Sequence, residues 1–114
     1  MGLDVRGKAV LVRTDFSQHW RTDRYCEENP FLTGEACDFL LDQGVRFVGI
    51  DSVNIDDLTG MSRPAHTKLP GAGVPICEHV TNLASVQDNG WHPHAVPVAW
   101  VGGATFPVRA DLMR

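Results

Sequence analysis

The chain has 114 residues, of which 43% are hydrophobic and 21% charged, and a net charge of -4 at pH 7. This length predicts one small domain covering residues 1–114. Clustered Lys and Arg, which phosphate binding needs, are missing, so we expect no nucleic-acid partner. We also expect no membrane partner, because no apolar stretch approaches the roughly 20 residues that cross a bilayer. The three cysteines are widely spaced and no signal-peptide pattern precedes them, which predicts reduced thiols and a cytoplasmic protein.

The first part of the chain predicts a strand, a helix and a second strand. Lys8–Arg13 is an apolar run typical of a buried strand. Thr33 is a good N-cap for a helix over Gly34–Gln43, and Gly44 takes the position that ends such helices. Arg46–Asp51 then predicts another buried strand, so this part forms an α-β unit.

The second part predicts one short helix and three strands. Pro64 suits the first position of a helix, which Pro70 ends. The predicted strands are Val74–Glu78, Ala95–Val101 and Phe106–Leu112. Strands outnumber long helices, so we predict the α/β class, with α+β possible, and a mixed sheet.

Candidate chemistry is concentrated around the third predicted strand. His66, Glu78 and His79 fall within one short unit, and Asp51 ends the strand before it. A histidine with one or two carboxylates can bind a divalent metal or act as a general base. The competing interpretation has Glu78 capping a turn and His66 as a solvated helix residue, and spacing alone favours it.

Two other groups of polar residues are interpreted as surface loops. His92 and His94 flank a proline, which forces an extended backbone and separates the two rings. The pair Asp56-Asp57 is interpreted as a solvated loop rather than a metal site.

Considered together, four segments resemble the C-terminal part of the cyclase family, which includes bacterial kynurenine formamidases and isatin hydrolases. In chain order they are GKAVLVRTDFSQHW, LTGEACDFLLDQGVRFVGIDSVNID, RPAHTKLPGAGVPICEHVTNL and FPVRA. The resemblance runs from about Gly7 to Arg109. It implies a swivelling β/α/β fold, incomplete at its N-terminal side, and hydrolysis of small amides or lactams with a divalent metal, zinc or manganese.

The resemblance also implies roles for four residues. His66 precedes Glu78 by twelve residues, as the catalytic histidine precedes the late metal-ligand glutamate in the family. His66 is therefore similar to the general acid/base and Glu78 to the metal ligand. Asp51 and Ser52 lie where the family's strand end faces the site, which makes them candidates for the substrate pocket.

The upstream metal-binding motif of the family, H-x-G-T-H-x-D-x-P-x-H, is missing from this sequence. The expected protein is thus a truncated or split enzyme, or a fragment, whose missing ligands come from a separate N-terminal half. The alternative is a catalytically inactive oligomeric or binding module. A homo-oligomer is expected because Trp20 and Trp91 lie among polar residues and suit an interface, whereas Trp100 is predicted to enter the core.

Overall fold

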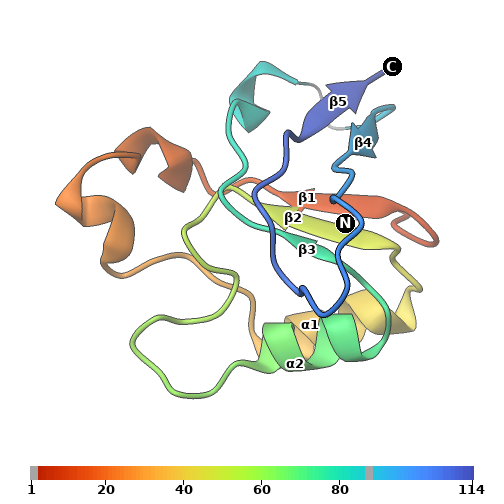
Figure 1. Cartoon of the computed structure of the whole chain (residues 1–114), viewed down its shortest axis with the longest axis horizontal. Helices are drawn as coiled ribbons and strands as arrows, with labels where there is room; N and C mark the ends of the chain where they lie inside the picture. Colours follow the sequence, from red (N-terminus) through yellow and green to blue (C-terminus); the bar gives the residue numbers. More distant parts are fainter. Residues whose placement is uncertain (1–2, 87–88) are drawn as a thin grey trace.

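The structure, a computed structural model, describes residues 3–86 and 89–114. A parallel sheet of three strands forms its centre, in the order β1 (Ala9–Val12), β2 (Phe47–Ile50) and β3 (Ile76–Cys77). Helix α1 (Gly34–Asp42) connects β1 to β2, and α2 (Pro64–Gly71) lies between β2 and β3. Figure 1 shows the two helices together on one side of this sheet.

The hydrophobic core fills the space between the sheet and the two helices. Val48 and Ile50 of β2 are fully buried, and Leu69 of α2 is buried with them. Parallel strands are covered in this way because each crossover lays a helix across the sheet. The buried cluster consists of Cys37, Leu40, Val45, Val48, Ile50, Ile55, Ala65, Leu69 and Val74.

The signals that delimit α1 act as predicted. The Thr33 hydroxyl accepts a hydrogen bond from the backbone N–H of Ala36 at 3.1 Å, which satisfies a donor at the helix start. Gly44 adopts a φ of 67°, a conformation that costs glycine little. The helix itself ends at Asp42, one residue before the predicted end.

The C-terminal part differs from the prediction. A second, antiparallel sheet pairs β4 (His92–His94) with β5 (Asp111–Met113), so a strand stands where a loop was expected. The strand predicted over 95–101 is wrong: this segment has no regular structure, and Val98 is largely exposed. Pro97 lacks an N–H for a ladder, and within residues 3–86 and 89–114 the segment pairs with neither sheet.

The expected α/β or α+β class is confirmed, with parallel and antiparallel strands in two separate sheets. The prediction that Trp100 enters the core is wrong, because its side chain is 68% exposed. The described residues also form three short 3-10 helices, η1 (Phe16–His19), η2 (Asp23–Cys26) and η3 (Leu83–Ser85). Within 3–86 and 89–114, no helix has the length and apolar character to span a membrane.

Candidate functional site

The carboxyl ends of the three parallel strands meet at one edge of the sheet, and Asp51 joins two of them. Asp51 directly follows β2 and is buried. One of its carboxylate oxygens accepts hydrogen bonds from the Thr14 N–H at 2.7 Å and the Thr14 hydroxyl at 2.6 Å, and the other accepts from the Asp15 N–H at 2.8 Å. Asp51 therefore fixes the loop after β1 to the end of β2.

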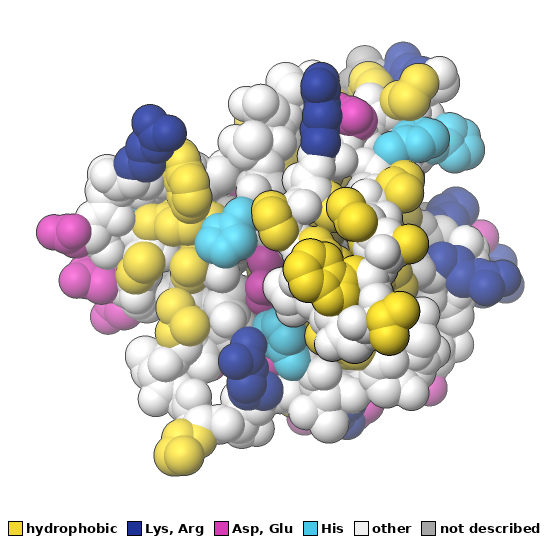
Figure 2. Space-filling model, in the orientation of Figure 1, with side chains coloured by type: hydrophobic (Ala, Val, Ile, Leu, Met, Phe, Trp, Pro, Cys, Tyr) yellow, Lys and Arg dark blue, Asp and Glu magenta, His cyan; other side chains and the backbone are white. Residues whose placement is uncertain are grey.

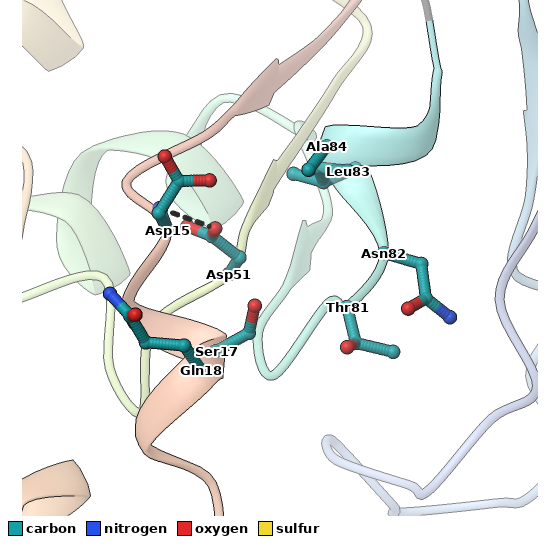
Figure 3. Close-up of a pocket in the computed structure, with 8 residues that line it drawn as sticks. All are labelled: Asp15, Ser17, Gln18, Asp51, Thr81, Asn82, Leu83 and Ala84. Atoms are coloured by element: carbon teal, nitrogen blue, oxygen red, sulfur yellow. Dashed lines mark hydrogen bonds between the residues drawn. The ribbon is translucent and has the colours of Figure 1, made fainter.

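A cavity of about 420 Å³ opens at this edge, and Figure 3 shows the side chains around it. Asp15 and Asn82, on opposite sides of it, have φ values of 61° and 60°. Left-handed backbone at non-glycine residues is uncommon and is often found at functional sites. The lining residues are Asp15, Ser17, Gln18, Asp51, Thr81, Asn82, Leu83 and Ala84.

Of the two predicted pocket residues, the structure places only Asp51 on the cavity. Ser52 is fully buried, and its hydroxyl donates to the Pro30 carbonyl at 2.8 Å. The Ser52 carbonyl accepts from the His79 N–H at 3.0 Å. Ser52 therefore supports neighbouring backbone on both sides.

His66, in the first turn of α2, is held by Asp56. Its Nδ1 lies 2.7 Å from Asp56 Oδ2, and Asp56 also accepts the backbone N–H groups of Ala65 at 2.8 Å and His66 at 3.0 Å. Asp56 is only 1% exposed. Burial alone would raise the pKa of this carboxyl, but the hydrogen bonds from the His66 and Ala65 backbone and the His66 ring outweigh it and keep the pKa below its usual value.

The interpretation of Asp56 as part of a solvated loop is thus wrong. The residue before α2, Arg63, makes no side-chain cap, so the first N–H groups of this helix need another acceptor. Asp56 supplies it from ten residues away in the sequence. The one sequence signal for this role is the missing capping residue before Pro64.

On its other side, the His66 ring faces Glu78. His66 Nε2 lies 3.4 Å from Glu78 Oε1, and the same oxygen accepts the Ile55 N–H at 2.8 Å. An ionised Asp56 can only accept, so Nδ1 carries a proton and Nε2 is the ring nitrogen directed at Glu78. Arg63 Nη2 lies 3.2 Å from Nδ1 and 3.4 Å from Nε2 of the same ring.

The structure therefore brings His66 and Glu78 together, while Asp51 and Ser52 make their hydrogen bonds to other residues. Tyr25 lies near Asp51 and Glu78. Burial raises the pKa of the Tyr25 hydroxyl, and electrostatic interactions with Asp51, Cys26 and Glu78 raise it further. Figure 2 shows acidic side chains in the middle of this face with histidines on either side of them.

The described residues do not fit a complete metal site. No group of three or more His, Cys, Asp or Glu side chains in this part of the chain is arranged to hold an ion. Catalytic zinc sites normally have three protein ligands. Glu78 has one carboxylate oxygen, Oε2, without a hydrogen bond among the described residues, so it can offer one ligand atom.

Sequence comparisons relate the chain to one family. The cyclase family model matches residues 2–57. Kynurenine formamidase of Bacillus cytotoxicus is 36% identical over 101 residues, which are 89% of this chain and 47% of that protein. Kynurenine formamidase of Bacillus cereus is 33% identical over 101 residues, which are again 89% of this chain and 47% of that protein. The chain therefore spans about half the length of the curated relatives it matches.

Solved structures agree with this relationship. A potential metal-dependent hydrolase with cyclase activity superposes with a TM-score of 0.80 at 29% identity, covering 98% of this chain and 53% of the other. An isatin hydrolase bound to thioisatinate, a product analogue, has a TM-score of 0.82 at 22% identity, covering 95% of this chain and 46% of the other. The second likeness supports the fold alone.

Proposed function

Because the chain belongs to the cyclase family, we propose that it is part of a metal-dependent hydrolase of small amides or lactams. The observation that supports this most directly is the position of His66. Its ring is held between the buried carboxylate of Asp56 at 2.7 Å and the carboxylate of Glu78 at 3.4 Å. A histidine oriented by a buried carboxylate is a recurring arrangement for general acid-base catalysis.

In this proposal His66 moves the proton and Asp56 positions it. The bond to Asp56 keeps the proton on Nδ1, so Nε2 is the atom that exchanges protons. Nε2 takes a proton from the attacking water and later delivers it to the leaving amide nitrogen. Asp56 remains ionised because three hydrogen bonds converge on it. It thereby stabilises the imidazolium that forms between the two steps.

Glu78 is proposed as this chain's ligand to a metal, because a structural relative is described as a metal-dependent hydrolase, and the family resemblance leads us to expect zinc or manganese. Such an ion lowers the pKa of water so that it can attack at neutral pH. The described residues lack the other ligands. We propose that these come from a region like the other half of the relatives, either on a separate polypeptide or on a longer form of this one.

The cavity beside Asp51 is the proposed place for the substrate. Its volume of about 420 Å³ is within the range of small-molecule sites, roughly 300–1,000 Å³. The relatives named kynurenine formamidase suggest an amide on an aromatic ring. Asp51 lines this cavity, and Ser52 is proposed to hold the backbone behind it.

Association with a second chain belongs to the same proposal. Val98 and Val101 expose most of their side chains, and Trp20 is 56% exposed. Apolar surface of this kind is penalised by water at roughly 25 cal/mol per Å². We propose a homo-oligomer or a complex with a separate N-terminal half, located in the cytoplasm. Size exclusion with light scattering tests the first form, and a mass near 12.5 kDa at micromolar concentration would contradict it.

The test of the activity uses the chain alone and the chain mixed with a polypeptide that carries the family's upstream motif. Both are assayed on N-formylkynurenine and isatin with zinc or manganese. His66→Asn keeps a donor toward Asp56 and removes the group at Nε2, so hydrolysis should fall by about 100-fold or more. His92→Asn, on the exposed β4 strand, is the matched control and should leave the rate unchanged. If the complemented protein hydrolyses none of these substrates, the alternative of a catalytically inactive binding module holds.

A further inference from the structure

The two histidines of β4 lie on one exposed face of the C-terminal sheet. His92 and His94 are two residues apart on the strand, and side chains with this spacing point to the same face. Both are exposed, whereas Pro93 between them is half-buried and points to the opposite face. Figure 2 shows histidine side chains gathered at the upper right, over this sheet. The strand therefore brings the two rings together at the surface.

Pro93 prepares the strand for this arrangement. Its ring fixes its own φ, and the residue before a proline is kept in the extended region. His92 is therefore extended even without a partner strand, and the pairing of β4 with β5 holds His94 extended as well. The two imidazoles are thus presented on one face before a ligand arrives, so little backbone freedom is lost on binding.

The register of the sheet adds two further groups to this face. His92 lies opposite Met113 and His94 opposite Asp111, and directly opposed residues of an antiparallel pair share a face. Met113 is 55% exposed, so its thioether lies at the surface. The Asp111 carboxylate adds negative charge, and Arg109 Nε lies 3.4 Å from it. Together the four side chains favour a cation that binds nitrogen and sulfur.

Two rings with this spacing can chelate one ion. Residues two apart on a strand are about 6.5 Å from each other. Rotation of the two side chains brings one nitrogen of each ring to the roughly 2 Å of a metal–imidazole bond. The second nitrogen binds at a high effective concentration once the first is in place, so the pair holds the ion more tightly than a single histidine does.

The number of ligands narrows the choice of cation. Within 3–86 and 89–114, no group of three or more His, Cys, Asp or Glu side chains is arranged to hold an ion, so the two rings act without a third ligand of these types. Zinc sites normally have three or four protein ligands, and magnesium and calcium prefer oxygen. Copper(II) accepts nitrogen and oxygen ligands in a square-planar or tetragonal arrangement and binds a given site most strongly among the first-row divalent ions.

We propose that His92 and His94 form a two-histidine chelate for copper(II), with water in its remaining coordination positions and the Met113 thioether on the same face. The site shares no residue with the proposed active site around His66 and Glu78. Its loss should therefore leave hydrolysis unchanged, which is the outcome expected for His92→Asn.

The test adds copper(II) chloride to the 114-residue chain carrying Cys26→Ser, because the exposed thiol of Cys26 would itself bind copper. Calorimetry measures the affinity. Paramagnetic broadening of backbone amide NMR signals locates the ion, and the signals of His92, His94, Asp111 and Met113 should broaden first. Zinc chloride, the comparison ion, should bind more weakly to the same chain.

Two variants separate the spacing of the rings from their number. His94→Ala removes one nitrogen and should weaken copper binding by about 100-fold, the lower end of the gain from a tethered second contact. His94→Ala combined with Ala95→His keeps two histidines but directs the second ring to the opposite face. This double variant should bind copper as weakly as His94→Ala. His19→Asn, in η1, is the control and should bind copper as the parent chain does.

The chelate is refuted if the double variant binds copper as tightly as the parent chain. It is also refuted if copper broadens signals elsewhere and leaves those of β4 and β5 sharp, a result that depends on no variant of the histidines. Both results leave the hydrolase proposal intact, because no measurement involves hydrolysis.

Discussion

Removing the Asp56 carboxylate should destabilise the protein more than any other single change to a charged side chain at this site. Asp56 is buried and accepts three hydrogen bonds, two from the start of α2 and one from the His66 ring. In Asp56→Ala, two backbone N–H groups lose their acceptor inside the protein. A buried donor left without a partner costs about 1–3 kcal/mol.

The expected magnitude follows from these contacts. A lost helix cap costs about 0.5–2 kcal/mol, and each buried donor left without its acceptor about 1–3 kcal/mol. His66 is partly exposed and can recover some hydration, so we expect a total near 3 kcal/mol for Asp56→Ala. Asp56→Asn keeps one acceptor oxygen and should lose roughly half as much. For a chain of this size, 3 kcal/mol corresponds to a fall in Tm of about 12 °C.

Asp57 provides a matched control in the adjacent position. Among the described residues, its carboxylate accepts only from the N–H and hydroxyl of Thr59, within a local turn at the surface. Asp57→Ala should therefore cost about 0.5 kcal/mol. Urea unfolding, followed by circular dichroism, measures both variants. Equal losses for Asp56→Ala and Asp57→Ala would refute the assignment of Asp56 as the cap of α2 and the support of His66.

Three further predictions concern pH, packing and capping. Because the pKa of Asp56 is lowered by folding, its carboxylate contributes stability that is fully present above the ordinary pKa of 3.8. This stability is lost as the pH falls through the lower pKa of the folded protein. In Asp56→Asn, the free energy of unfolding should therefore fall less steeply as the solution is acidified. Gly49→Ala would place a methyl group 2.5 Å from the Leu11 side chain and should lower the free energy of unfolding by about 1–3 kcal/mol. Gly71→Ala is the control, because open space surrounds this position, and it should not destabilise the protein. Equal changes in Tm for the two variants would contradict this prediction. Thr33→Ala removes the cap of α1 and should cost about 1 kcal/mol in urea unfolding, and no change would argue against that cap.

The parallel part of the fold could be predicted from the sequence because its signals are local. Apolar runs of four to eight residues predict buried strands, and both β1 and β2 formed where such runs lie. The cap at Thr33 and the glycine at position 44 delimit α1 through contacts within a few residues. The roles of His66 and Glu78 were inferred from a family resemblance and stay a prediction; the structure places their side chains 3.4 Å apart.

The C-terminal sheet and the role of Asp56 were decided by tertiary structure. A strand forms only where another edge is available, and no local pattern reveals that β4 meets β5 while the more apolar segment 95–101 stays unpaired. Asp56 carries the same local signal as Asp57, yet one is buried under α2 and the other lies in a surface turn. The difference arises because burial and hydrogen bonding depend on what the fold brings near from elsewhere in the chain, and a carboxylate is buried only where enough donors converge to replace its water.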